Sequence, residues 1–266
     1  MVLARTAAAA LALVLAAPQA RAGDALTPLE YSWAVDGAVT GVAVVATGTL
    51  MLMRNELAPR ACKWCEPGSL DGEIARAVAW SSPRAANTTS DVLQWVVPVG
   101  MLGYGLAQAY RLGNPTAGWS DVLIVAEATS VAMLINTVVK YAVGRARPYA
   151  WTGDDPYGET TDANLSFFSG HSTFAFAVSV SAGTVYLMQG MPGAPAALGA
   201  GLVLSAFTAY LRMAAEQHYL TDVLAGAALG SLVGWAVPFL FHRPAKASAT
   251  AAPAVVLPTG GFALAF

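Results

Sequence analysis

Apolar residues along this chain form long runs that are separated by shorter polar stretches. Most of the runs are close to the roughly 20 residues with which an α-helix crosses about 30 Å of hydrocarbon. One run is shorter, but it reaches this length when it begins at His171. None alternates apolar and polar residues as a membrane β-strand does. The pattern predicts an all-α fold, a polytopic membrane helical bundle of about six transmembrane helices: Val35–Met53, Val92–Tyr110, Val122–Val139, Phe174–Met188, Ala194–Leu211 and Val223–Phe241.

The composition supports this interpretation. Only 11% of the residues are charged and 56% are hydrophobic, whereas a soluble domain carries about 25% charged residues. A net charge of −2 gives no sign of nucleic-acid binding. Small residues such as Gly226, Gly230 and Gly234 are abundant inside the runs, and they let membrane helices approach one another closely.

The two ends of the chain differ from this pattern. Residues 1–22 resemble a signal peptide, with Arg5 ahead of the apolar stretch Ala7–Ala17 and a small-x-small sequence at Ala20–Ala22. An uncleaved first anchor is the alternative. Residues 23–90 are expected to form an N-terminal helix and a polar loop, and 91–243 the core. Residues 244–266 form an Ala/Pro-rich tail.

Two cysteines lie close together in the polar loop, as Cys62-Lys63-Trp64-Cys65. One such pair cannot supply the four ligands of a structural zinc site. A redox dithiol is an alternative, but the thioredoxin-like context is missing. We expect a local disulfide in an oxidising compartment.

Three polar clusters interrupt the apolar chain. They read Lys140-x6-Arg147-Pro148, Ser169-Gly170-His171 and Arg212-x5-His218-x3-Asp222. Ionisable groups next to membrane segments are costly unless they serve one another or a ligand. The clusters lie at the ends of the third and fifth runs and at the starts of the fourth and sixth. In an up-and-down bundle all three therefore emerge at one membrane face.

Each cluster contains groups that handle phosphate. On a continuing helix Lys140 and Arg147 would share one face, and Pro148 would then end that helix or force a turn. The N–H groups at Ser169 and Gly170 precede an apolar helix and so favour an anion, while Arg212 offers a fork for phosphate oxygens.

Two histidines can supply the reaction chemistry. Asp222 follows His218 by four residues, on one face at the start of a helix, so its carboxylate can orient the imidazole as a nucleophile or base. His171 can protonate a leaving group. The set indicates phosphoryl transfer without a metal or other cofactor.

The combined pattern resembles the signature of the type 2 phosphatidic acid phosphatase and vanadium haloperoxidase superfamily, in its membrane lipid-phosphatase branch, over roughly residues 91–243. The resemblance implies a phosphohistidine on His218 that is oriented by Asp222, with His171 as the general acid. It also implies phosphate binding by Lys140, Arg147, Ser169, Gly170 and Arg212. Two positions depart from the pattern: Phe168 replaces a proline and Leu211 replaces a serine. Neither change removes a charged group.

The expected activity is hydrolysis of a lipid phosphate or diphosphate of the phosphatidate, phosphatidylglycerophosphate, polyprenyl diphosphate or lipid A type. The expected partners are the membrane and this phosphorylated lipid, with no nucleic acid. A lipid phosphotransferase is one alternative, and a non-catalytic lipid-binding or redox-partner protein built on the cysteine pair is another. A haloperoxidase is less compatible with so apolar a chain.

Arguments about the membrane face conflict. A cleaved signal followed by six spans, together with the basic residues of the polar loop, places the clusters in the cytoplasm. The resemblance and a disulfide favour the periplasmic face, which we expect. Two further polar residues, Glu127 and His242, are expected to serve in inter-helix hydrogen bonding and at the membrane interface respectively. The acidic residues 154–162 are expected to form a solvated loop.

Overall fold

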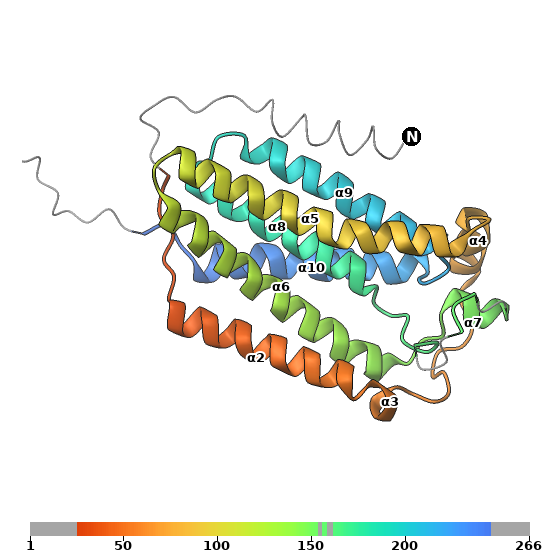
Figure 1. Ribbon diagram of the computed structural model, residues 1–266. Coiled ribbons are helices and arrows are strands. Elements are labelled where there is room, and N and C mark those ends of the chain that lie inside the picture. The colour runs from red at the N-terminus through yellow and green to blue at the C-terminus, as the bar shows by residue number, and fades with distance from the viewer. Residues whose placement is uncertain (1–25, 154–155, 159–161, 246–266) are drawn as a thin grey trace, which may run out of the picture.

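A computed structural model describes residues 26–245 except 154–155 and 159–161 (Figure 1). The signal-like segment 1–22, the tail from 246 onward and most of the acidic loop therefore lie outside the described residues. The described part is all-helical, as the apolar pattern predicts. Its helices are α2 (Trp33–Leu52), α3 (Arg54–Leu57), α4 (Ser69–Val78), α5 (Pro83–Arg111), α6 (Pro115–Val143), α7 (Pro148–Thr152), α8 (Gly170–Gln189), α9 (Ala194–Ala214) and α10 (Leu220–Phe241).

Five of these helices, α2, α5, α6, α9 and α10, are long and apolar enough to cross a membrane. The fourth predicted segment, Phe174–Met188, forms α8, which also has 20 residues but is not among the five. Several of its polar side chains, including Ser172, Thr173, Ser179 and Ser181, are fully buried. This helix packs against α5, α6, α9 and α10, so its polar side chains face other helices.

The long helices start and end at residues whose chemistry fits those positions. Proline occupies the first position of α5 and of α6, where no backbone hydrogen bond is lost. Asn114 caps the start of α6 by accepting a hydrogen bond from the Ala117 N–H at 3.2 Å. The polar loop is partly helical, because it contains α3 and α4, and α5 begins nine residues before the predicted run at Val92.

Helix α10 lies very close to α8. A Cβ atom built on Gly230 would come within 2.3 Å of the Thr173 carbonyl oxygen, and Gly226 and Gly234 face the α8 backbone in the same way. The predicted close approach at small residues is therefore observed between these two helices. It sets the position of the α8 N-terminus relative to the start of α10.

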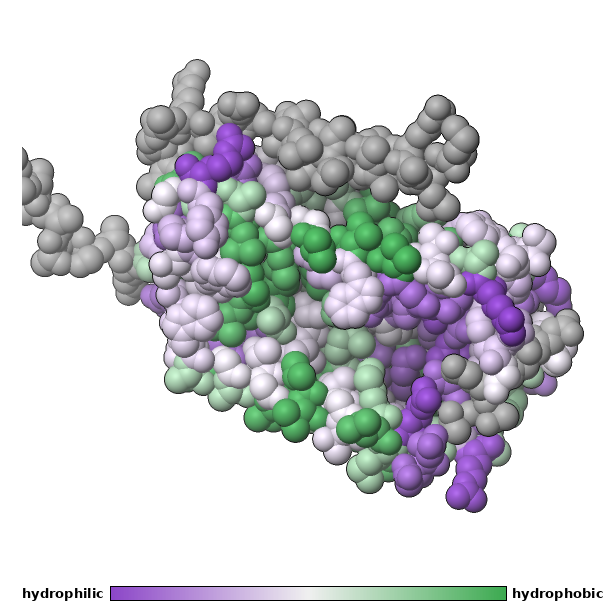
Figure 2. All heavy atoms as spheres, viewed as in Figure 1, coloured by the Kyte–Doolittle hydropathy of each residue, from purple (hydrophilic) through white to green (hydrophobic). Residues whose placement is uncertain are grey.

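The ends of α6 and α9 and the starts of α8 and α10 lie at the same end of the bundle, beside α4 and α7 (Figure 1). Apolar side chains cover the middle of the face in Figure 2, whereas hydrophilic ones gather at the end that carries α4 and α7. The three clusters thus meet at one polar end of an apolar bundle.

Candidate functional site

One cavity of about 400 Å³ lies at the polar end of the bundle. It is lined by six of the eight residues that the clusters single out: Lys140, Arg147, Gly170, His171, Arg212 and His218. They come from three stretches that are far apart in the sequence, 140–147, 170–171 and 212–218, so the convergence of the clusters is observed. Ser169 and Asp222 are fully buried behind this lining.

Lys140 and Arg147 reach the cavity from different backbone segments. The expectation that they share a continuing helix is wrong, because α6 ends at Val143 and Gly144 follows in the left-handed conformation, with φ of 60°. Pro148 begins α7 instead of ending α6. The Lys140 Nζ donates to the Leu165 carbonyl at 2.8 Å. The turn at Gly144 is what brings Arg147 back over the cavity.

Arg147 is held by its neighbours. Its Nε donates to the Asp162 carbonyl at 2.8 Å, and its Nη1 donates to the Gln217 side chain. Its Nη2 lies 3.4 Å from the Asp162 carboxylate, which also pairs with Arg54 at 3.3 Å. Asp162 is therefore part of the site's charge network, whereas a solvated loop was expected.

Helix α8 begins at Gly170, directly at the second cluster. Ser169 is its N-cap, and the hydroxyl accepts from the Ser172 N–H at 3.3 Å. The Ser169 N–H donates to the Asp222 carbonyl at 3.1 Å, so it is not available to a phosphate as expected. Gly170 lines the cavity, and the first N–H groups of a helix have no partner within it.

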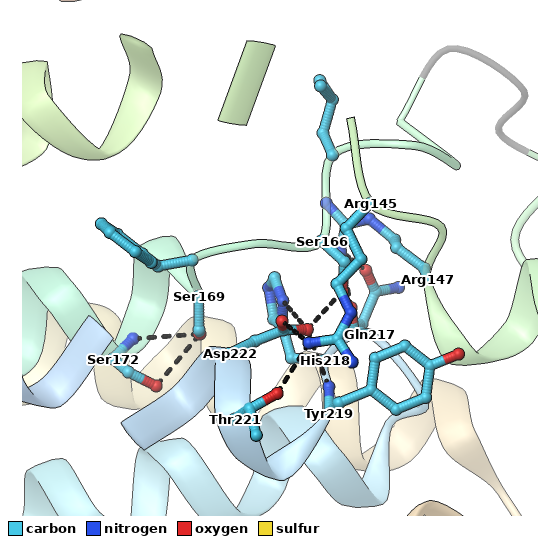
Figure 3. A network of polar contacts seen from close by, with 12 residues as sticks. Arg145, Arg147, Ser166, Ser169, Ser172, Gln217, His218, Tyr219, Thr221 and Asp222 are labelled. Carbon is cyan, nitrogen blue, oxygen red and sulfur yellow. Dashed lines mark hydrogen bonds and ion pairs between the residues drawn. The ribbon is translucent and has the colours of Figure 1, made fainter. Parts of the chain in front are cut away.

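His218 and Asp222 lie close together but differ in detail from the expected pair. His218 precedes α10, and its Nδ1 is 3.7 Å from the Asp222 Oδ2. This exceeds hydrogen-bond length, and the buried Nδ1 has no hydrogen-bond partner. The reason is that Asp222 Oδ2 already accepts from the Ser166 hydroxyl at 2.5 Å and from the Tyr219 N–H at 2.9 Å (Figure 3).

Cations dominate the surroundings of His218. Burial, followed by the charges of Lys140, Arg147 and Arg212, lowers the pKa of His218 well below its ordinary value. The imidazole is therefore neutral at neutral pH, which leaves a nitrogen lone pair for attack.

Helix α5 contributes polar residues that sequence reasoning missed. Asp91 Oδ1 lies 2.9 Å from the His171 Nε2 and 3.6 Å from the Arg212 Nη1. The Arg212 Nη1 also donates to Asn87 at 2.6 Å and to Ser90 at 3.0 Å. Asn87, Ser90 and Asp91 lie close together near the start of α5. Nothing in the sequence tied this part of α5 to the clusters.

Arg145 is a second residue near the site that sequence reasoning missed. It lies between Lys140 and Arg147, is 1% exposed, and forms an ion pair with Asp222 at 2.5 Å (Figure 3). It forms a second ion pair with Asp71 at 2.6 Å. A third basic residue within eight positions of a chain so poor in charge was a signal that could have found it.

The cysteine pair lies at the same end. Cys62 and Cys65 form a disulfide, and the loop between them hydrogen-bonds to the turn after α6, with the Lys63 N–H donating to the Gly144 carbonyl at 2.9 Å.

His242 and Glu127 pair with each other away from the cavity. The His242 Nε2 lies 3.0 Å from Glu127 Oε2, and its Nδ1 lies 3.0 Å from the Glu30 carbonyl. The inter-helix role expected for Glu127 is confirmed. The interfacial role expected for His242 is wrong, because this side chain is only 2% exposed.

The fold and the site define a polytopic helical membrane protein in which four basic side chains, Arg54, Lys140, Arg147 and Arg212, and two histidines line one cavity. Residues 121–245 match the family model of the PAP2 superfamily. The predicted resemblance is thereby confirmed. The matched range begins within α6, after α2 to α5.

One curated relative is a lipid A 1-phosphatase from Porphyromonas gingivalis, which is 29% identical over 179 residues. The match covers 64% of this chain but only 35% of the relative. No solved structure matches the chain.

Proposed function

We propose that this chain is a metal-independent phosphatase of lipid phosphates that works through a phosphohistidine on His218. The match to the PAP2 superfamily and the lipid A 1-phosphatase relative support phosphatase activity. Lys140, Arg147 and Arg212 line one cavity, and basic side chains in such a place stabilise the oxygens of a phosphoryl group during transfer.

The lipid nature of the substrate is supported by a second cavity. A groove of about 510 Å³ runs between α2, α5, α6 and α8 and is lined mostly by apolar side chains, with Thr47, Gln94, Thr129 and Ser130 as the polar ones. It shares Met51, Gln94 and Met133 with the polar cavity. A phosphorylated head group can thus lie among the cations while an acyl or prenyl chain extends along the groove. This continuity is the observation that carries the proposal.

The reaction proceeds in two steps. The His218 Nε2 attacks phosphorus, and the bond from phosphorus to the leaving oxygen breaks as His171 gives that oxygen its proton. Water then attacks the phosphohistidine, passes a proton to His171 and releases inorganic phosphate. Asp222 stabilises the charge that develops on His218, for which its 3.7 Å contact to Nδ1 must shorten by about 0.7 Å to reach hydrogen-bond length.

His171 is held ready for its task by Asp91. The carboxylate lies 2.9 Å from Nε2 and can accept a hydrogen bond from that nitrogen. The leaving oxygen takes the place of the carboxylate when the substrate binds, and Asp91 then remains near Arg212.

A substrate panel tests the proposal. Purified protein in detergent with EDTA should release phosphate from one or more of phosphatidate, phosphatidylglycerophosphate, polyprenyl diphosphate and lipid A. His218→Ala should abolish the release, and a matched change of the remote histidine, His242→Ala, should not if the variant folds. No release by the wild type, or full activity in His218→Ala, would contradict the proposal. Label transferred to a lipid acceptor instead of water would identify a phosphotransferase.

The same proposal places the site on the periplasmic face, because the disulfide at that end suits an oxidising compartment. Intact cells treated with a membrane-impermeant reductant and then an impermeant maleimide should become labelled at Cys62 and Cys65. Labelling only after lysis would place the site in the cytoplasm.

A further inference from the structure

The guanidinium of Arg145 is buried among acidic, hydroxyl and aromatic side chains. Its Nη2 donates to Asp71 at 2.6 Å, and its Nη1 donates to Asp222 at 2.5 Å and to Thr221 at 2.7 Å. Its planar faces are covered by aromatic rings, with the Trp64 ring centre 3.8 Å and the Tyr219 ring centre 4.3 Å from Cζ. Arginine suits this place because it can form a planar fork and stack at the same time.

Arg145 has a different task from Arg147. It is absent from the residues that line the cavity in the described part of the chain, and both of its Nη atoms are already used by protein acceptors. Because Arg145 is also only 1% exposed, its guanidinium is not placed to bind a phosphate in the cavity.

Asp222 depends on this arginine. The carboxylate is 0% exposed, and Arg145 is its partner through Oδ1, while Ser166 and the Tyr219 N–H occupy Oδ2. Removing one partner of a buried ion pair is costly because the other charge stays uncompensated. Arg145 thus both compensates a negative charge on Asp222 and fixes the plane in which its oxygens face His218.

Two elements outside the family-matched residues hold Arg145 in turn. Asp71, on α4, also accepts from the Thr221 N–H at 3.0 Å and its hydroxyl at 2.6 Å. Burial acts to raise the pKa of Asp71, but the hydrogen bonds from Thr221 and Arg145 hold that pKa below its ordinary value. Asp71 is therefore charged at neutral pH and completes a row of carboxylate, guanidinium and carboxylate.

The second element is the disulfide loop. Trp64 lies between Cys62 and Cys65, and its carbonyl accepts from the Ala146 N–H at 3.0 Å. Its ring stacks on Arg145. Because the disulfide restricts the loop to a few conformations, it keeps the ring over the guanidinium.

We propose that Arg145 is a positioning residue for the His218–Asp222 pair, and that Asp71 and the Cys62–Cys65 loop hold Arg145 in place through Trp64. The proposal rests on the proposed phosphatase function. It predicts that replacing the Arg145 guanidinium slows the chemical step while phosphate binding stays intact.

Kinetics of Arg145→Lys, with Arg147→Lys as the matched control, test the proposal. Lysine keeps the charge but can neither bridge two carboxylates nor stack as a plane. Arg145→Lys should lower kcat about 10- to 100-fold, the range seen when groups that orient a site are lost. KM and the inhibition constant of inorganic phosphate should stay within about twofold of wild type. Arg147→Lys should raise both constants.

Asp71→Asn provides a second test of the same network if Arg145→Lys does not fold. This isosteric change should lower kcat with KM unchanged, and gel filtration and a melting curve establish that the variant is folded. A folded variant at either position with wild-type kcat would overturn the proposal, and so would a kcat loss matched by weaker phosphate binding. Wild-type protein inactive on every lipid phosphate would instead overturn the proposed function, and this inference with it.

The disulfide loop has its own readout. Reduction with dithiothreitol should lower the kcat of wild type several-fold, and a Cys62→Ser, Cys65→Ser double variant should have that lower kcat and no longer respond to the reductant. A kcat that is the same before and after complete reduction would show that the loop does not hold Arg145.

Discussion

Gly230→Ala should separate α10 from α8 and thereby damage the site, although Gly230 does not line the cavity. A Cβ atom at this position would lie 2.3 Å from the Thr173 carbonyl oxygen and 2.9 Å from the Ala177 nitrogen. Ordinary contact begins near 3.4 Å. Both atoms belong to the α8 backbone, which cannot turn away as a side chain can. The helices must therefore separate by about 1 Å.

The separation acts on residues that belong to the reaction. The N-terminus of α8 positions Ser169, Gly170 and His171, and the Ser169 N–H donates to the Asp222 carbonyl across the same helix contact. A misplacement of about 1 Å can lower a rate roughly 100-fold. Overpacking of this kind also costs about 1–3 kcal/mol of stability.

The assay compares kcat/KM and the melting temperature of Gly230→Ala with those of Gly199→Ala in the same detergent. Gly199 is a sound control because it is also inside a helix, and nothing lies within 4 Å of a Cβ atom built there. Gly199→Ala should match the wild type. Wild-type activity and melting temperature in Gly230→Ala would refute the argument that this contact sets the site.

Three further predictions follow from the groove and the histidines. Ala126→Phe, in the groove, should lower kcat/KM for long-chain substrates about tenfold, or about 1.4 kcal/mol, and should leave kcat/KM for a short-chain phosphate unchanged. The control Ala107→Phe, on the exposed face of α5, should leave kcat/KM unchanged for both substrates. Burial acts to lower the pKa of His242, but the hydrogen bonds to Glu127 and the Glu30 carbonyl and the charges of Glu127 and Asp36 raise it. The charged His242–Glu127 pair therefore stabilises the fold fully below about pH 6.5, and this stabilisation is lost as pH rises through the raised pKa of His242. The difference in melting temperature between wild type and Glu127→Gln should therefore shrink from about pH 6 to pH 9, and a constant difference would contradict this assignment. The lowered pKa of His218 predicts no acid limb from this residue in kcat/KM between about pH 6 and 7, once ionisation of the substrate phosphate is accounted for.

Sequence patterns were enough to predict the bundle and the meeting of the clusters, because both follow from the order of apolar runs. Once six runs alternate in direction, the ends that carry Lys140, His171 and His218 must share a face. Local signals also placed the start of α8 correctly, since Ser169 and Gly170 are residues that begin a helix.

The remaining features depend on contacts between distant segments. The turn at Gly144 overrode the expected helix from Lys140 to Arg147, because a glycine in the left-handed conformation ends a helix as effectively as a proline. Asp71 and Asp91 are far from the clusters in sequence, and only the packing of α4 and α5 brings them to Arg145 and His171. Periodicity carries no information about such pairs.

The phosphohistidine is the central claim, and its direct test is to trap it. Protein given a phosphate-labelled substrate and quenched in alkali should carry label on His218, located by mass spectrometry and lost on mild acid treatment. With a substrate whose leaving group needs no protonation, His171→Ala should accumulate more of this label, because hydrolysis of the intermediate then lacks its base. His218→Ala should carry none. Label on another residue, or rapid turnover by the wild type with no labelled protein in either the wild type or His171→Ala, would contradict the account.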